Sequence, residues 1–328
     1  MSEPLIKVRG LKKYFSTPEG MLHAVDGVTF DLEKGKTLGI VGESGCGKST
    51  TGRAILQVYP VTAGEVIIDG VDVTKLKGKE LRKYRKQMQM IFQDPYASLN
   101  PRKNIYQTIE EPLIIHNLYP DKEKRKKRVR ELMKLVGLAE RLENTYPHEL
   151  DGGRRQRAVI ARALSIDPQF IICDEPVSAL DVSIQAQILN LLQDLQEKLG
   201  LTFIFITHDL SVVKHISHDI LVMYLGKIVE KAKSDSLFEK PIHPYTIALL
   251  SAIPVPDIDY INKEILLEGE ITSPVNPKQN CLFSGRCQFS IKKCKNEIPK
   301  LEDIGPNHSV ACHRHKEILE GTLSYGSF

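Results

Sequence analysis

The chain has 328 residues, of which 41% are hydrophobic and 26% are charged, and 45 basic and 41 acidic side chains give it a net charge of +4. This length and composition predict a soluble intracellular protein with two or three domains. They argue against a nucleic-acid-binding protein, which needs a concentrated basic patch. The sequence predicts no signal peptide, because "MSEPLIKVRG" has no apolar core after a basic start, and no membrane span, because it lacks an 18-residue apolar run.

The first 92 residues predict short strands and turns that lead to one strand–loop–helix unit. We expect a strand at 37–41, "TLGIV", and a helix from Lys48 through "STTGRAILQV". The loop between them, "GESGCGKST", matches the phosphate-binding pattern G-x-x-x-x-G-K-[ST]. Its glycines let backbone N–H groups approach phosphate oxygens, its lysine reaches the β and γ phosphates, and the next hydroxyl binds Mg²⁺. The predicted ATP-binding residues here are Gly42, Ser44, Gly45, Cys46, Gly47, Lys48, Ser49 and Thr50.

Residues 94–158 predict an inserted helical region. Apolar side chains from Val129 to Val136 recur at helical spacing, and Gly137 is expected to end that helix. The basic run at 121–130 includes acidic residues and no aromatic residue, which favours a solvated helix face over a nucleic-acid patch.

The second half of the chain predicts an α/β sheet followed by a small extension. "FIIC" at 170–173 and "TFIFIT" at 202–207 are continuous apolar runs, as expected of strands buried on both faces. A helix between them ends at Gly200, and the strand–helix–strand order favours parallel strands with right-handed crossovers. From about 232 the sequence becomes rich in Pro, Cys, His and Lys.

Four polar residues at predicted strand ends have the chemistry of ATP hydrolysis. Asp174 follows "FIIC", where a carboxylate can hold the Mg²⁺ shell, and the adjacent Glu175 can act as general base toward the attacking water. His208 follows "TFIFIT" and can contact the γ-phosphate. Gln93, in "MIFQDP", can position Mg²⁺ or water.

The order P-loop, Gln93, "LDGG", Asp174–Glu175, Asp181 and His208 resembles the ATP-binding subunits of ABC transporters over nearly the whole chain. The stretches "QMIFQDPYASLNPR", "YPHEL", "IICDEPVSALDVSIQAQILNLL" and "KPIHPYT" are similar to dipeptide/oligopeptide permease ATPases of the second, F-type subunit. The resemblance implies a P-loop core with a parallel sheet and an antiparallel β-subdomain. It implies an ATPase domain at 1–232 with its helical subdomain at 94–158, and an extension at 233–328.

The same resemblance implies a mechanism and partners. Two ATPase subunits form a head-to-tail dimer that binds ATP between the P-loop of one and the signature of the other. The dimer drives two transmembrane permease subunits on the cytoplasmic face of the membrane, supplied by an extracytoplasmic peptide-binding protein. Carried onto this chain, Gln93 is the Q-loop residue, Asp181 the D-loop residue and His208 the switch histidine. The adenine-stacking aromatic is expected to be Phe15, with Tyr14 as the alternative.

The signature is the one motif that departs from the family pattern. Where the family has LSGGQ, this chain has Leu150, Asp151, Gly152, Gly153 and Arg154. A hydroxyl that donates to the γ-phosphate is replaced by a carboxylate that only accepts when ionised. Like charges about 5 Å apart repel by about 3 kcal/mol at an effective dielectric near 20, and Arg154 offsets part of this. We therefore predict hetero-pairing with one dominant hydrolytic site. In the alternative, Asp151 turns aside and backbone amides still bind ATP.

The last fifth of the chain holds a predicted metal site at Cys281, Cys287, Cys294 and Cys312. Four thiolates suit an iron–sulfur cluster or Zn²⁺, but the C-x₂-C knuckles of zinc ribbons are absent. Some peptide-permease ATPases hold a [4Fe–4S] cluster on such cysteines, so the resemblance favours [4Fe–4S] over zinc. His308, His313 and His315 are possible substitute ligands.

Three other functions are alternatives to a transport ATPase. A regulatory GTPase needs an N-K-x-D guanine motif, which is absent. Soluble ATPases of DNA repair or translation carry coiled-coil insertions or two cassettes, whereas this chain has one cassette. A mainly regulatory, degenerate ATP-binding subunit fits Asp151, but Glu175 and His208 argue against it.

Overall fold

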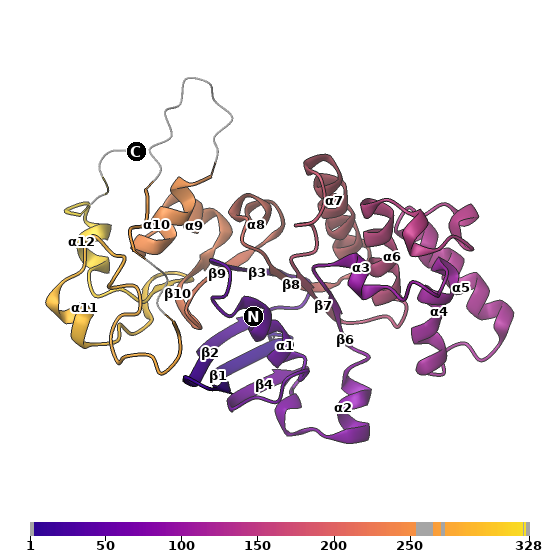
Figure 1. Cartoon of the computed structure of the whole chain (residues 1–328), viewed down its shortest axis with the longest axis horizontal. Coiled ribbons are helices and arrows are strands. Elements are labelled where there is room, and N and C mark those ends of the chain that lie inside the picture. Colours follow the sequence, from indigo (N-terminus) through magenta and orange to yellow (C-terminus); the bar gives the residue numbers. More distant parts are fainter. Residues whose placement is uncertain (1–2, 254–264, 270–272, 324, 326–328) are drawn as a thin grey trace. The chain divides into compact units, whose positions relative to one another are not determined.

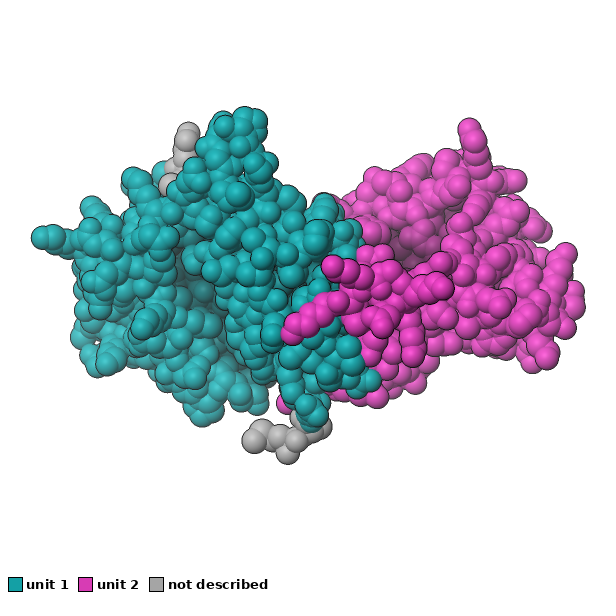
Figure 2. Space-filling view, turned by 90° about the horizontal axis from the view of Figure 1, so that it is seen from below, with its two compact units in different colours: residues 1–32, 37–74, 206–328 teal, residues 33–36, 75–205 magenta. Residues whose placement is uncertain are grey.

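The computed structural model describes residues 3–253, 265–269, 273–323 and 325. The chain forms two compact units, coloured separately in Figure 2. Unit 1 contains residues 1–32, 37–74 and 206–328, and unit 2 contains residues 33–36 and 75–205. Among the described residues, none of the helices combines the length and apolar character that a membrane span requires.

Unit 1 contains an antiparallel sheet and the strands that carry the P-loop (Figure 1). The antiparallel sheet has the order β2-β1-β4-β5, and the other strands follow the order β11-β12-β10-β9-β3. The bounds are β1 Ile6–Thr17, β2 Gly20–Leu32, β3 Thr37–Val41, α1 Lys48–Ile55, β4 Ala63–Ile68, β5 Val71–Asp72, α8 Leu210–Ile216, β9 Asp219–Tyr224, β10 Lys227–Lys233, α9 Ser234–Glu239, α10 Pro244–Ser251, α11 Lys292–Asn296, β11 Glu302–Gly305, β12 His308–Val310 and α12 His315–Leu319.

Unit 2 combines three strands with the helical region. Its strands follow the order β8-β7-β6. The bounds are α2 Gly78–Tyr84, β6 Met88–Ile91, α3 Pro95–Ser98, α4 Ile105–Ile115, α5 Lys122–Leu135, α6 Gly152–Leu164, β7 Phe170–Asp174, α7 Val182–Leu199 and β8 Thr202–Ile206, with short 3₁₀ turns at Glu140–Leu142 and Pro147–Glu149. A further 3₁₀ turn, Val73–Lys75, begins in unit 1. Helices α4 and α5 pack against α6, so the predicted helical insertion is present.

The predicted parallel strands are confirmed in both units. Strand β3 pairs in parallel with β9, and β6 pairs in parallel with β7. All five residues of β3, β7 and β8 are buried, which explains their continuous apolar runs. Helix α7 ends at Gly200, whose φ of 64° is left-handed, as the sequence predicts.

One predicted element boundary is changed by the structure. The predicted helix through Val58 ends at Ile55, because Gln57 adopts a left-handed φ of 53°. The N–H groups of Val58 and Gln57 then donate to the last turn of the helix, which closes it as a C-terminal cap.

The segment that contains the four clustered cysteines, residues 281–312, is called the Cys-rich segment below. Its strand β12 pairs antiparallel with β10 in unit 1. The predicted domain boundary at 232 stays a prediction.

Candidate functional site

The P-loop, Gly42–Thr50, connects β3 to α1 in unit 1. Two of its glycines are required by close backbone contacts. A Cβ atom on Gly42 would lie 2.2 Å from the Met223 carbonyl oxygen, and one on Gly47 would lie 2.1 Å from the Ala24 carbonyl oxygen. Their φ angles of 149° and 104° also disfavour other residues. The glycines of the motif therefore fix the loop in one path.

Helix α1 presents its first turn without a side-chain cap. Its N-cap residue is Gly47, which makes no side-chain cap hydrogen bond. A helix N-terminus of this kind favours a phosphate through its backbone amides and electrostatically. Lys48 is 5% exposed, and its Nζ donates to the carbonyl oxygens of Gly42 at 2.7 Å and Glu43 at 2.9 Å.

The remaining P-loop residues differ in exposure. Ser44 and Gly45 are exposed at the tip, while Ser49 and Thr50 are half-buried in the first turn of α1. Cys46 is 3% exposed, and burial raises the pKa of its thiol. Cys46 is therefore a buried neutral side chain of the loop.

Phe15 and Tyr14 on β1 have different surroundings. The Tyr14 ring stacks on His23 with centroids 3.8 Å apart, and its hydroxyl donates to Asp26 at 2.5 Å. Phe15 is half-buried, meets the edge of Tyr59 with ring centroids 5.5 Å apart, and has the Lys13 ammonium 4.7 Å from its ring centroid. The Tyr14 hydroxyl and ring are both engaged inside the subunit, and the choice of Phe15 as the stacking residue stays a prediction.

In unit 2 the structure brings Gln93 and Glu175 together. The Gln93 amide Nε2 donates to Glu175 Oε2 at 2.8 Å. Asp174 is the last residue of β7 and is 3% exposed. Glu175 follows with a φ of 49°, a strained value for a residue with a side chain, of the kind that collects at functional sites. The strand end therefore holds a buried carboxylate and a second, partly exposed one.

His208 lies in unit 1, after β8 and before α8, and its side chain is exposed. The preceding Thr207 donates its N–H to the Ile40 carbonyl oxygen of β3 at 3.2 Å. This hydrogen bond places the chain just before His208 beside the strand that leads into the P-loop. Gln93, Asp174 and Glu175 belong to unit 2.

The signature Leu150–Arg154 forms the start of α6. Asp151 is the N-cap residue, and its Oδ1 accepts a hydrogen bond from the Arg154 N–H at 2.7 Å. The Arg154 Nε lies 3.4 Å from the other oxygen, and both side chains are about half exposed. The Asp151 carboxylate thus already occupies the N-terminal end of α6.

The two signature glycines fit α6 against the segment that carries Asp181. A Cβ atom on Gly152 would lie 2.9 Å from Leu180, and one on Gly153 would lie 2.8 Å from Ile184. Asp181 caps α7 by accepting from the Ile184 N–H at 3.0 Å. The signature and the D-loop therefore form one packed structure in unit 2.

The four cysteines of the Cys-rich segment are unpaired thiols in unit 1. Burial raises the pKa of Cys281 and Cys287 to about 11 and that of Cys312 to about 12, and neighbouring cysteines add to each shift. The Cys281 N–H donates to the Cys294 carbonyl oxygen at 2.9 Å. Within the described ranges, however, no group of three or more His, Cys, Asp or Glu side chains is arranged to hold a metal ion. The predicted metal site is not borne out as a preformed ion site.

Sequence reasoning missed a contact between this segment and the P-loop. Arg286, between Cys281 and Cys287, donates two hydrogen bonds to the Glu43 carboxylate, and the Tyr245 hydroxyl accepts from the Glu43 N–H. The sequence feature that could have indicated this contact is Glu43, a glutamate at a variable position of the phosphate-binding motif. Its negative charge beside a phosphate site favours a neighbouring cation.

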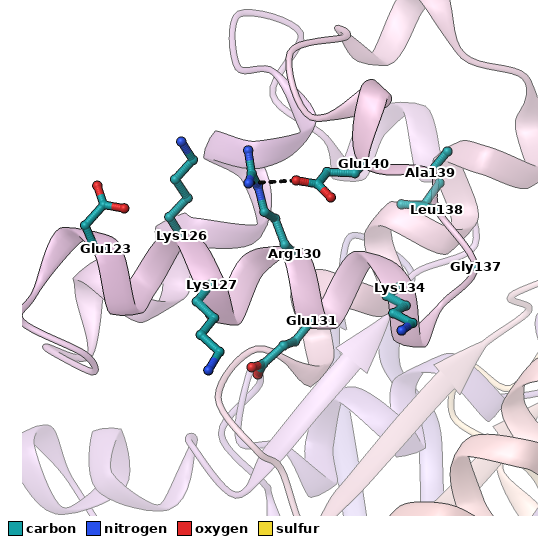
Figure 3. A pocket seen from close by; sticks show the side chains of 10 residues that line it. All are labelled: Glu123, Lys126, Lys127, Arg130, Glu131, Lys134, Gly137, Leu138, Ala139 and Glu140. Atoms are coloured by element: carbon teal, nitrogen blue, oxygen red, sulfur yellow. Dashed lines mark ion pairs between the residues drawn. The ribbon is translucent and has the colours of Figure 1, made fainter.

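A depression of about 780 Å³ lies along α5 and the turn after it (Figure 3). Charged residues of α5 line it, such as Lys126 and Lys127, together with Leu138 and Ala139 of the turn, and an ion pair of 2.7 Å joins Arg130 to Glu140. It contains none of the predicted site residues. The basic run at 121–130 thus forms a solvated helix face, as predicted.

Two family models match the chain. Residues 25–178 match the ABC transporter model, and residues 229–294 match the model of the oligopeptide/dipeptide transporter C-terminal region. The chain is 50% identical over 321 residues to the oligopeptide transport ATP-binding protein AppF of Bacillus subtilis, covering 95% of this chain and 97% of that protein. This chain belongs to the ATP-binding subunits of ABC transporters.

Other relatives agree with that assignment. The putative oligopeptide transport ATP-binding protein YkfD of Bacillus subtilis is 51% identical over 316 residues, covering 95% of this chain and 96% of its own. Among solved structures, the dimeric ATP-binding cassette MJ0796 bound to ADP and phosphate has a TM-score of 0.64 and 33% identity, covering 70% of this chain and 98% of its own. The ABC ATPase fold and the ATP-hydrolysing class of the protein follow from these matches.

Proposed function

We propose that the chain is the ATP-hydrolysing subunit of an ABC importer for dipeptides or oligopeptides. The observation that carries the proposal is the presence in one chain of a P-loop and a match to the oligopeptide/dipeptide transporter C-terminal region at 229–294. The P-loop supplies the phosphate site, and the C-terminal region distinguishes peptide-transport subunits from other cassettes. A mainly regulatory role is not favoured, because Glu175 and His208 are both present.

We propose a role in ATP binding or hydrolysis for residues of the P-loop and for polar residues that follow strands of the sheet. Lys48 and the amides of α1 bind the phosphates, and Phe15 stacks on the adenine. Ser49, Gln93 and Asp174 hold Mg²⁺, which neutralises phosphate charge when bound. Glu175, whose carboxylate accepts from Gln93, acts as general base toward water, and His208 contacts the γ-phosphate.

The test of this function is ATP-dependent peptide uptake. Vesicles that hold the two permease subunits, this chain and a second ATPase subunit are supplied with the binding protein and a labelled oligopeptide. We expect uptake with wild-type protein, and an ATPase rate about 10²–10⁴ times lower with Glu175→Gln. ATP hydrolysis without uptake of any peptide would contradict the importer but not the ATPase.

The pairing proposal concerns the signature. The chain pairs with a second ATPase subunit and lies on the cytoplasmic face of the membrane, bound to the permease subunits. Its own P-loop, facing a partner's serine signature, forms the dominant hydrolytic site. The partner's P-loop faces Asp151, whose carboxylate already accepts from the Arg154 N–H and repels phosphate. The cap contact also supports part of the alternative, because it turns the carboxylate toward its own helix.

The four cysteines are proposed to bind a [4Fe–4S] cluster, with zinc as the alternative. Neighbouring cysteines raise the pKa values of the Cys281 and Cys312 thiols, and this supports the proposal. A single tetrahedral zinc with bonds of about 2.3 Å needs all four sulfur atoms around one ion, whereas the thiolates of an iron–sulfur cluster can lie farther apart. Iron, sulfide and zinc analysis of anaerobically purified chain tests this. About four irons per chain support the cluster, and one zinc or no metal contradicts it.

A further inference from the structure

The Cys-rich segment contacts the P-loop at one residue, Glu43. Arg286 Nη1 and Nη2 donate to the two carboxylate oxygens of Glu43 at 2.7 and 3.0 Å, which makes a bidentate pair. The Arg286 side chain is 9% exposed and that of Glu43 is 24% exposed. A pair this enclosed is less screened than a surface salt bridge.

Glu43 is held at its backbone as well as its side chain. Its N–H donates to the Tyr245 hydroxyl at 2.8 Å, and its carbonyl oxygen accepts from Lys48 Nζ at 2.9 Å. Tyr245 is fully buried and packs against Phe283, with ring centroids 5.5 Å apart. Glu43 therefore connects Lys48 of the P-loop to Tyr245 of α10 and to Arg286.

The turn that carries Arg286 is fixed by its own backbone. The Ser284 N–H donates to the Cys281 carbonyl oxygen at 2.9 Å, and the Arg286 N–H donates to the Phe283 carbonyl oxygen at 3.0 Å. Phe283 is 2% exposed and also meets Tyr224, with centroids 5.3 Å apart. The Arg286 guanidinium therefore contacts the P-loop from a turn that is closed by its own backbone hydrogen bonds.

A carboxylate at position 43 creates an electrostatic problem. The motif G-x-x-x-x-G-K-[ST] leaves this position open, so Glu43 is not needed for phosphate binding. An uncompensated negative charge in this loop repels the phosphates of a nucleotide. Arg286 is placed to cancel that charge, because both of its terminal nitrogens face the carboxylate.

We propose that Arg286 is a positioning residue for nucleotide binding, which neutralises the Glu43 carboxylate of the P-loop from the Cys-rich segment. The inference rests on the proposed ATPase function and deepens it. Arg286 contacts Glu43 and the Tyr224 side chain, so it acts on nucleotide affinity through the loop. The C-terminal region thereby has a role in ATP binding.

The experiment is a double-mutant cycle on the full chain, read by titration calorimetry with Mg-ADP. Arg286→Gln leaves Glu43 uncompensated and is expected to weaken binding on the order of tenfold. Glu43→Gln is expected to bind within about twofold of wild type, and the double variant to recover most of the loss. Arg286→Lys, which keeps the charge but not the fork, is expected to fall between wild type and Arg286→Gln.

The matched control is Arg314→Gln, which breaks an arginine–glutamate pair with Glu317 in the same segment. It is expected to bind Mg-ADP as wild type does. In the assembled transporter, Arg286→Gln is expected to raise KM for ATP by the same factor as the Kd for Mg-ADP, while kcat changes by less than about twofold. This is because the variant loses binding energy that is equal in the ground state and the transition state. Thermal melts establish that each variant is folded.

Two results would overturn the inference. One is an Arg286→Gln variant that binds like wild type. The other is a double variant that binds as weakly as Arg286→Gln, which would make the arginine a structural support and not a neutralising one. Failure of the wild-type chain to bind Mg-ADP at all would instead overturn the ATPase function itself.

Discussion

Helices α1 and α6 both begin with glycine-containing loops of a nucleotide-binding motif, but their first turns differ. At α1 the N-cap is Gly47 and no side chain caps the helix. At α6 the N-cap is Asp151, whose carboxylate accepts from the Arg154 N–H. The first end offers amides to a phosphate, and the second has already satisfied one of them with a negative charge.

The difference shows that a helix N-terminus whose N–H groups bind a capping carboxylate is less suited to bind a phosphate as well. An aspartate is among the best N-cap residues, so Asp151 stabilises α6 in the free subunit. Under the proposed pairing, the same carboxylate would oppose the γ-phosphate of a partner's nucleotide. The P-loop end depends instead on support from outside the helix, through Glu43, Tyr245 and Arg286.

The largest expected effect comes from breaking the α1 end. Lys48→Ala removes the ammonium that now donates to the Gly42 and Glu43 carbonyl oxygens and is placed to reach the phosphates. Loss of such a charged donor is expected to lower the ATPase rate by about 10²–10³. The control is Lys198→Ala, which removes a side chain 66% exposed on α7. A Lys48→Ala variant with more than a tenth of wild-type activity would contradict the role.

The α6 end is expected to improve when its carboxylate is removed. Asp151→Ser restores a hydroxyl that both caps the helix and donates to a phosphate. We expect ATPase activity of this chain alone to rise on the order of tenfold, because two weak sites become competent. Asp121→Ser is the matched control, since Asp121 caps α5 in the same way, through the Glu123 and Lys124 N–H groups. Equal rates for Asp151→Ser and wild type would show that the carboxylate is harmless.

The support behind the α1 end is expected to weaken in acid. His243 Nδ1 accepts from the Tyr245 N–H at 3.1 Å, and burial lowers the pKa of His243 to about 3. In the unfolded chain the pKa is about 6.5, so between these values the unfolded state binds more protons and the unfolding free energy falls as pH falls.

The expected loss of unfolding free energy from pH 7 to pH 5.5 is about 1 kcal/mol, measured by urea unfolding. His243→Asn keeps a capping side chain without a titrating group, and its unfolding free energy is expected to change less over the same interval. An identical pH dependence in both proteins would rule out His243 as the cause.

The smallest effect concerns the cap itself. Asp151→Ala loses the hydrogen bond to the Arg154 N–H and is expected to cost about 1 kcal/mol of unfolding free energy. Asp151→Asn keeps an acceptor and is expected to lie within a few tenths of a kcal/mol of wild type. Thermal melts distinguish the two, with a lower Tm by about 2–4 °C for the alanine variant alone. Equal melting of all three would mean that the cap contributes nothing.

The sequence predicted most of the fold because its strands and loops carry strong local signals. The apolar runs that became β3, β7 and β8, and the glycines at 42 and 47, specify their structures by burial and backbone conformation alone. The end of α1 could not be predicted, since a left-handed Gln57 has no local signal comparable to glycine. The Arg286–Glu43 pair joins residues 243 positions apart, so only the folded chain reveals it.

The proposal that this chain has one strong and one weak nucleotide-binding end is tested by Mg-ATPase activity. The rate of the chain alone is compared with that of an equal mixture with its co-encoded ATPase subunit, and Glu175→Gln in this chain is the control. We expect activity only in the mixture, and its loss with Glu175→Gln. Strong activity of this chain alone would contradict the proposal, and would mean that Asp151 is tolerated in the signature.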